Sequence, residues 1–193
     1  LVELALGLKG RRYCVEIVLL KARNDFSQDL AKAGVSVTAL HRTKWDVGVL
    51  WRLYRHLRNT RPDVLHSFLP VANLVGVMVG RLARVPRVLV SIRSSYEATL
   101  GRCWRRVARW SHRRADRVIV NSEAARREEL EAGFPPERLD YVPNGIRLAA
   151  APAPGRAALD LPEGPLVLSV GQLEAIKGHG DLIDAWATVH AAV

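Results

Sequence analysis

Residues 171–178 have the composition of a loop that could hold a diphosphate. They follow an apolar run, residues 166–170, that predicts a buried strand, and they precede a predicted helix that begins near His179. Gly171 and Gly178 permit a tight turn, while the N–H groups and dipole of the helix N-terminus attract an anion. Lys177 adds a full positive charge beside them. The same spacing also occurs in ligand-free connections between a strand and a helix, so both interpretations stay open here.

Three other polar residues lie at or just after the ends of predicted strands. His66 ends one strand, and Arg93 and Ser94 follow the next one along the chain. Ligands of open α/β sheets bind at the carboxyl ends of the strands, so the side chain of His66 is a candidate for a binding site. His66 fits a ligand contact or a hydrogen-bonded structural residue.

The elements that must position these residues follow an alternating pattern. Short β-branched runs, apolar on both faces, alternate with longer stretches of helical periodicity, which is typical of a parallel sheet covered by helices on both sides. Ser122 is placed to cap the start of one helix, and Gly133 to end it. The pattern predicts an α/β protein with an open, doubly wound sheet. The predicted strands are residues 15–20, 35–40, 64–66, 88–92, 118–120 and 139–142.

Composition excludes several classes of function. The two cysteines are far apart and indicate neither a zinc site nor a disulfide framework, which favours a reducing cytoplasm. No hydrolase elbow or Walker-type phosphate loop occurs. The most apolar stretch, residues 71–82, is too short to span a membrane.

The charge is strongly positive, with 29 Lys and Arg against 19 Asp and Glu and a formal net charge of +10. Such a charge suits a nucleic acid or an anionic membrane surface. The excess of arginine over lysine can equally reflect the nucleotide composition of the coding sequence. One predicted helix, residues 99–114, combines Trp104 and Trp110 with many arginines and suits the surface of an anionic membrane, or alternatively packs its tryptophans on the sheet.

Five segments of the chain resemble, in the same order and with similar spacing, the signatures of family 4 glycosyltransferases. Each segment is weakly specific alone, but together they span the whole chain and make the resemblance specific. The segments are residues 61–66 (Arg-Pro-Asp-Val-Leu-His), 80–88 (a helix-to-strand junction with Val-Pro), 115–124 (Ala-Asp through Ser-Glu), 142–146 (Val-Pro-Asn-Gly-Ile) and 170–186 (Val-Gly-Gln-Leu through Lys-Gly and an apolar helix).

The resemblance implies a GT-B fold, in which two Rossmann-like domains face each other across a cleft. Residues 1–146 would be the acceptor-side N-terminal domain without its first strand, residues 147–165, rich in Ala and Pro, a linker, and residues 166–193 the first strand and helix of the donor-binding domain. The implied reaction is transfer of a sugar, with retention of configuration, from a nucleotide diphosphate sugar to a glycan, lipid-linked or small-molecule acceptor. The family needs neither a cofactor nor a bound metal. A role in polysaccharide biosynthesis, in the cytoplasm or at the inner face of the membrane, would follow.

The resemblance also assigns the site residues. Donor binding would fall to Gly171, Gln172, Lys177 and Gly178, and Gln172 stands where the family usually has Arg, which leaves Lys177 as the cation of this loop.

The acceptor-side residues would be His66, Arg93 and Ser94. Arg93 stands roughly where many relatives have His, and it fits either a group that orients an acceptor or stabilises phosphate charge, or a solvated surface residue. Lys177 and Arg93 are therefore the predicted catalytic residues. Asn144 and Gly145 would form a turn and hinge between the domains.

Two further signatures of the family would lie outside this sequence. A Gly-rich loop would precede Leu1, and a Glu-x7-Glu segment would follow Val193. We therefore expect a chain truncated at both ends and inactive by itself. Two other functions stay open at this point: a nucleotide-sugar epimerase of the same fold, and a basic α/β module that binds nucleic acid, although most arginines lie on the outward faces of predicted helices and no nucleic acid partner is expected.

Overall fold

The computed structural model of the chain describes residues 2–9, 11, 13–21, 27–43, 46–93, 101–145, 155–161, 164 and 166–192. For residues 27–29, 102, 157, 176 and 190–192 it describes the backbone alone. The chain divides into two compact units, Leu1–Gly145 and Ile146–Val193. They are described separately below.

The first unit alternates strands and helices, and all its described strands are parallel. One sheet pairs β1 with β2, and a second has the order β3-β4-β5-β6. The six strands predicted within this unit are confirmed, with ends that differ by one or two residues. The elements are α1 (Val2–Lys9), β1 (Glu16–Leu19), α2 (Ser27–Lys32), β2 (Ser36–Ala39), α3 (Gly48–Thr60), β3 (Val64–Phe68), α4 (Pro70–Leu82), β4 (Arg87–Ile92), α5 (Arg102–Arg114), β5 (Arg117–Val120), α6 (Glu123–Glu131), the 3₁₀ helix η2 (Pro136–Arg138) and β6 (Leu139–Tyr141).

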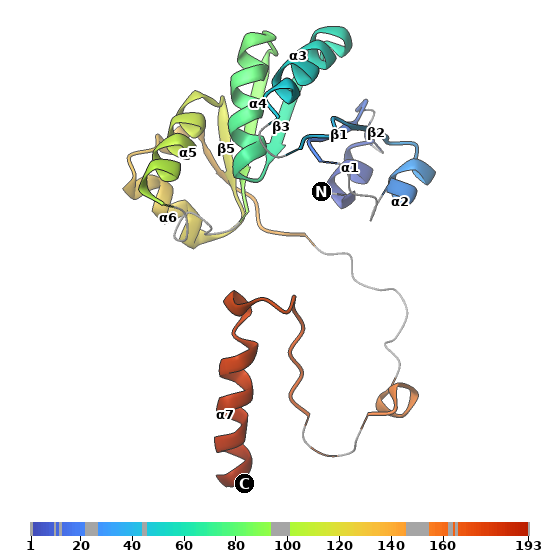
Figure 1. Cartoon of the computed structure of the whole chain (residues 1–193), viewed down its shortest axis with the longest axis vertical. Coiled ribbons are helices and arrows are strands. Elements are labelled where there is room, and N and C mark those ends of the chain that lie inside the picture. Colours follow the sequence, from blue (N-terminus) through green and yellow to red (C-terminus); the bar gives the residue numbers. More distant parts are fainter. Residues whose placement is uncertain are drawn as a thin grey trace. The chain divides into compact units, whose positions relative to one another are not determined.

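The core of this unit lies on β4 and β5. Val88, Val90, Val118 and Val120 are completely buried, because helices cover the sheet over these strands. In Figure 1, α3 and α4 lie together beside β3, and α5 and α6 lie beside β5. Ser122 caps α6 as predicted, accepting a hydrogen bond of 3.2 Å from the amide of Ala125.

Helix α4 approaches the sheet closely because two of its residues are glycines. A Cβ at Gly80 would lie 2.8 Å from Leu65 Cδ2 and 3.1 Å from Val88 Cγ2, and one at Gly76 would lie 3.1 Å from Ser67 Cβ. The missing side chains let the helix backbone rest directly on β3 and β4.

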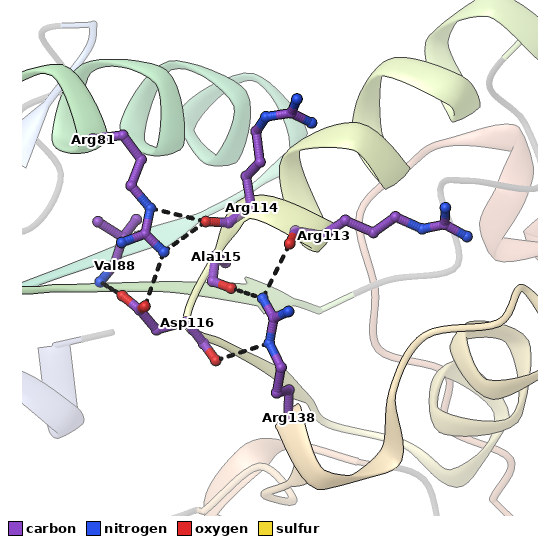
Figure 2. Close-up of polar contacts among 7 residues, drawn as sticks. All are labelled: Arg81, Val88, Arg113, Arg114, Ala115, Asp116 and Arg138. Carbon is purple, nitrogen blue, oxygen red and sulfur yellow. Dashed lines mark hydrogen bonds and ion pairs between the residues drawn. The ribbon is translucent and has the colours of Figure 1, made fainter.

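The end of α5 is held by two arginines and one aspartate, as Figure 2 shows. Arg81 donates from Nε and Nη2 to the carbonyl of Arg114, at 2.9 and 2.7 Å, and Arg138 donates to the carbonyls of Arg113 and Ala115. Asp116 accepts from Arg81 at 2.9 Å and from the amide of Val88 at 2.6 Å. The carbonyls that a helix leaves unpaired at its C-terminus are thereby satisfied, and α4, α5 and β4 are tied together.

The second unit contains the 3₁₀ helices η3 (Arg156–Leu159) and η4 (Ala175–Lys177) and the helix α7 (His179–Ala192). The helix predicted to begin near His179 is confirmed. The strand predicted at residues 166–170 is wrong for this structure: these residues form no strand, and Val170 is 88% exposed. A strand needs a neighbour that supplies ladder hydrogen bonds, and no described residue supplies them. Within the predicted linker, residues 156–159 form the short helix η3, although most of that segment lies outside the described residues.

Candidate functional site

The carboxyl ends of β3, β4 and β5 bring together the polar residues of the first unit. His66 lies on β3, and its Nε2 is 2.8 Å from the hydroxyl of Ser91 on β4. Ser91 is almost completely buried, and the ring of His66 lies against that of Phe68, with 4.3 Å between the centroids. The parallel register aligns His66 with Leu89. Ser91 lies two residues further along β4, toward the carboxyl edge, and its side chain is on the same face of the sheet as that of Leu89.

Arg93 is fixed at the same edge by residues from distant parts of the chain. Its guanidinium donates a short hydrogen bond to Asn144 Oδ1, and its carbonyl accepts from Asn121 Nδ2 at 3.3 Å. Asn121 also lies 3.4 Å from Asn144 Oδ1, and Arg93 lies over the ring of Phe68 at 6.0 Å from its centroid. Arg93 is thus tied to its neighbours rather than freely solvated. Asn144, predicted as part of a hinge, holds this arginine, and the sequence reasoning had given no role to Asn121.

The environment of His66 keeps its imidazole neutral. Burial disfavours the charged ring, and the positive charge of Arg93 acts in the same direction, so the pKa of His66 falls to about 4. At neutral pH His66 therefore offers one N–H donor and one nitrogen acceptor, and no charge. Such a residue can orient a hydroxyl group, but it cannot stabilise an anion as an imidazolium would.

A small cavity of about 20 Å³ adjoins this cluster. Asn73 on α4 and His112 on α5 line it, together with Ser91, Arg93 and the residues at the start of α4. A larger cavity, about 320 Å³, lies where α3 and α4 end, and therefore at the amino ends of β3 and β4. Because ligands of open α/β sheets bind at the carboxyl ends, we assign the candidate site to the edge that carries His66 and Arg93.

Ser94, predicted on the acceptor side, lies outside the described residues. Among the residues that the structure describes, no group of three or more His, Cys, Asp and Glu side chains could hold a metal ion.

The candidate donor loop lies in the second unit and turns directly into α7. Residues 175–177 form η4, and Gly178 follows with φ of 65°, a conformation that favours glycine. Lys177 and Gln172 are exposed, and the first amides of α7 follow Gly178. The loop therefore combines an exposed cation with the N-terminus of a 14-residue helix, which are the two features that attract an anion.

His179 shapes this loop, and sequence reasoning assigned it no role. Its Nε2 lies 3.0 Å from the carbonyl of Gln172, and its Nδ1 lies 3.5 Å from the hydroxyl of Ser169. A Cβ at Gly171 would lie 3.3 Å from His179 Nε2, so glycine gives the imidazole room to fold back over the loop. The signal in the sequence was weak, because a His at the start of a helix has no distinctive spacing.

Comparison with known proteins identifies the family. Residues 1–150 match the family model described as Glycosyltransferase Family 4. The chain belongs to glycosyltransferase family 4. Curated proteins give no match.

Solved structures show the GT-B fold of this family 4 chain. It resembles crystal structures of HepE from Anabaena in complex with UDP and glucose, with 18% identity, and in complex with UDP-glucose, with 19% identity, each at a TM-score of 0.63. The similarity covers 75% of this chain and 40% and 39% of those two structures. The family 4 chain therefore spans about two fifths of the length of these structures.

Proposed function

We propose that this chain takes part in transferring a sugar from a nucleotide diphosphate sugar to a hydroxyl group of an acceptor, with retention of configuration. The observation that carries the proposal is the family match over residues 1–150, together with the loop from Gly171 to Gly178, which offers a cation and a helix N-terminus to a diphosphate. The binding of UDP and UDP-glucose by HepE supports this choice of donor. Residues 1–146 would carry the acceptor side and residues 166–193 part of the donor side.

On the donor side, Lys177 and the first amides of α7 would stabilise the departing diphosphate. The glycosidic bond breaks with its electron pair on the phosphate oxygen, so negative charge grows there during the reaction. Gln172 and the backbone at Gly171 and Gly178 would position the phosphates. Lys177 supplies the positive charge within this loop, so the proposal needs no metal ion or other cofactor.

On the acceptor side, Arg93 and neutral His66 would orient the acceptor hydroxyl. The guanidinium of Arg93 already donates to Asn144, so less side-chain entropy is lost when it meets a substrate. His66 can accept or donate one hydrogen bond at the same edge. The acceptor would be a glycan, a lipid-linked sugar or a small molecule, as in polysaccharide biosynthesis. Asn144 and Gly145 would form the hinge between the units.

An association with the inner face of the membrane would suit a lipid-linked acceptor. No described helix has both the length and the apolar character needed to cross a bilayer. Helix α5, however, exposes Arg106, Arg109 and Arg113, and Arg114 stacks over the exposed ring of Trp110 at 4.2 Å from its centroid. Tryptophan favours the headgroup region and arginine an acidic surface, which supports peripheral binding from the cytoplasm.

The proposal is tested with nucleotide sugars. The chain is titrated with UDP and UDP-glucose by calorimetry, and mixtures with glycoside acceptors are followed by NMR, which gives the anomeric configuration of any product. Saturable binding of UDP is expected, and any product should keep the configuration of the donor. Absence of binding by every nucleoside diphosphate tested would contradict the donor assignment, and an inverted product would contradict retention. Interconversion of nucleotide sugars without an acceptor would indicate an epimerase instead.

A further inference from the structure

The cavity of about 320 Å³ where α3 and α4 end lies at the amino edge of the sheet, away from the candidate site. The charged residues of its lining are all arginines: Arg58, Arg61 and Arg84. The buried apolar residues of its lining are Leu57, Ala83 and Val85. None of the acidic residues that the structure describes lines this cavity. The lining therefore combines an apolar surface with positive charge alone.

The three arginines of the cavity differ from a neighbouring arginine that stabilises the fold. Arg81, three residues before Arg84, donates to Asp116 and to the carbonyl of Arg114. In contrast, the guanidinium groups of the cavity form no hydrogen bond or ion pair with any residue that the structure describes. All three residues are exposed, and the flexible stem of an arginine lets its guanidinium turn toward an anion in the cavity. They are therefore available to a ligand.

Arg61 and Arg84 follow the two helices in the left-handed backbone conformation. The angle φ is 47° at Arg61, the C-cap of α3, and 60° at Arg84, two residues after the end of α4. Glycine usually fills such a position after a helix, because a Cβ is strained there. At Arg61 the strain is greater, since a proline follows and favours an extended conformation. Strained residues cluster at ligand sites, so two of them in the lining of one cavity support a binding function.

The charge at the cavity stays positive after the helix ends are counted. Each helix C-terminus carries about half a negative charge, so α3 and α4 together offset about one of the three arginines. Asp63, the acidic residue nearest in sequence, does not line the cavity. The remaining charge of about +2 matches a phosphomonoester, which carries about −1.5 to −2 at pH 7. Guanidinium groups also match the geometry of phosphate oxygens, with which they form paired hydrogen bonds.

The volume of the cavity indicates a ligand larger than a phosphate ion. One water molecule occupies about 30 Å³ in the liquid, so about 320 Å³ gives room for on the order of ten non-hydrogen atoms. A phosphate ion has about half that number. A short carbon chain therefore fits beside the phosphoryl group, where it would contact the buried apolar residues of the lining.

We propose that this cavity binds a small phosphomonoester, whose phosphoryl group is held by Arg58, Arg61 and Arg84. The inference does not depend on the transferase function, because the cavity lies at the opposite edge of the sheet from His66 and Arg93.

The test titrates sn-glycerol 3-phosphate, inorganic phosphate and acetate into the chain and follows the amide signals by NMR. The variant Arg61→Asn with Arg84→Asn removes two charges, and asparagine tolerates the left-handed conformation. The matched control is Arg55→Gln with Arg127→Gln, which removes two exposed arginines of α3 and α6 that do not line the cavity. If the asparagine variant does not fold, Arg58→Gln within the regular helix α3 replaces it.

In the parent chain, glycerol 3-phosphate should shift the amide signals of residues 57–62 and 83–86, and acetate should bind at least about tenfold more weakly. The asparagine variant should bind glycerol 3-phosphate at least about tenfold more weakly than the parent, because two charge-assisted contacts are lost. The control should stay within about twofold of the parent. Without ligand, the asparagine variant should melt at or above the temperature of the parent, because it relieves like-charge repulsion and backbone strain.

A second arm separates a soluble ligand from a lipid. Vesicles of phosphatidylcholine with and without phosphatidic acid present the same phosphomonoester on a membrane. Arginine-dependent binding of glycerol 3-phosphate would assign the cavity to a soluble molecule. Pelleting that needs phosphatidic acid and is lost only in the asparagine variant, without binding of glycerol 3-phosphate, would assign it to a lipid headgroup.

The proposal is overturned if neither the soluble phosphates nor the phosphatidic acid vesicles bind, or if the asparagine variant binds them as the parent does. A lower melting temperature of that variant with unchanged phosphate binding would show that the arginines only offset the two helix ends.

The donor loop also attracts phosphate, so the titration is repeated in Lys177→Ala. Binding that shifts residues 57–62 and 83–86 and persists in Lys177→Ala would support the cavity, whether or not UDP binds to the chain. Shifts that are confined to the donor loop, lost in Lys177→Ala and unchanged in the asparagine variant would overturn the proposal and leave the donor assignment intact.

Discussion

His66 Nε2 lies 2.8 Å from Ser91 Oγ, and this hydrogen bond joins β3 to β4 at the edge where Arg93 also lies. Because burial and the charge of Arg93 lower the pKa of His66 to about 4, the imidazole stays neutral in the folded protein under conditions in which an exposed histidine would take up a proton. The pair therefore gives the carboxyl edge of β3 and β4 a pH-sensitive contribution to stability.

We predict that the stability of the parent chain falls as the pH is lowered from about 6.5 to about 4. The unfolded chain protonates His66 near 6.5 and the folded chain near 4, so in this window the unfolded state binds more protons. Between about pH 7 and about pH 5, His66 should remove up to about 2 kcal/mol of the free energy of unfolding. For a unit of this size, thermal unfolding should then shift by about 5 °C.

The control for this prediction is His66→Gln, which can still hydrogen-bond Ser91 and does not titrate. Thermal unfolding followed by circular dichroism should show a smaller decrease between the two pH values in this variant than in the parent. The other histidines contribute equally to both proteins and cancel. Parallel curves for the two proteins would mean that His66 has an ordinary pKa in the folded chain.

Asp116 should contribute more to stability than an exposed aspartate with an equally good arginine partner. Burial by itself would raise the pKa of Asp116, but the hydrogen bonds from Arg81 and the Val88 amide, with the charges of Arg81 and Arg87, lower it overall. Asp116→Ala removes the acceptor of the Val88 N–H and one of the two acceptors of the Arg81 guanidinium (Figure 2), and should lower the free energy of unfolding by about 1–3 kcal/mol.

The matched control is Asp140→Ala. Asp140 binds Arg117 through two hydrogen bonds of 2.5 and 2.6 Å, but both side chains are more than a third exposed. Its removal should cost less than about 1 kcal/mol. Urea unfolding of both variants measures the difference, and equal losses would contradict the role given to the Asp116 network.

The two glycines Gly80 and Gly7 should respond in opposite ways to replacement by alanine. At Gly80 the new methyl group would meet Leu65 Cδ2 at 2.8 Å and the completely buried Val88, so Gly80→Ala should destabilise by about 1–3 kcal/mol. Gly7 lies inside α1, where an added Cβ would have no described atom within 4 Å, so Gly7→Ala should stabilise by about 0.5–1 kcal/mol. A urea midpoint for Gly80→Ala at or above that of the parent would contradict the close approach of α4 to the sheet, and a lower midpoint for Gly7→Ala would contradict the open surroundings of Gly7.

Strands were predictable from the sequence because the signal was local. A run such as residues 88–92 is apolar on both faces. This pattern is typical of a strand in a parallel sheet that helices cover on both sides. Residues 166–170 have the same pattern and form no strand, because a strand also depends on a hydrogen-bonding neighbour that the run itself does not contain. Local periodicity thus indicated the capacity to form a strand in both segments.

The candidate site was predictable in part. The end of a predicted strand indicated His66, because ligands of open α/β sheets bind at that edge, and the family resemblance indicated Arg93. Asn73 was missed, since a single Asn within an apolar helix has no periodicity that distinguishes it, and its place beside the small cavity results from tertiary packing. Asp116 lay in a segment that resembled the family, but its partners Arg81 and Val88 come from distant positions, so its structural role could not be derived from spacing.

The basic face of α5 should bind an anionic membrane surface. Arg106→Glu with Arg109→Glu reverses two exposed charges, and each basic residue near an acidic surface contributes about 1 kcal/mol, so binding should weaken at least about tenfold. Arg55→Glu with Arg58→Glu on α3 makes the same change of net charge elsewhere and should have a smaller effect. Co-sedimentation with phosphatidylcholine vesicles, with and without phosphatidylglycerol, measures both. Equal pelleting with the two kinds of vesicle, insensitive to salt, would exclude α5 as a membrane surface.

Lys177→Ala should weaken the binding of UDP about tenfold to a hundredfold. Gln172 brings no charge, so Lys177 is the full positive charge that the loop of residues 171–178 offers to a diphosphate. Loss of one charge-assisted contact costs about 1.5–3 kcal/mol, and the amides at the start of α7 would remain to hold the phosphates in part. Calorimetric titration of UDP measures the change, with Lys32→Ala, an exposed lysine of α2, as the control that alters net charge equally. If Lys177→Ala bound UDP as tightly as Lys32→Ala, the diphosphate would have to bind elsewhere on the chain. The assignment of Gly171, Gln172 and Gly178 to the donor site would then also be wrong.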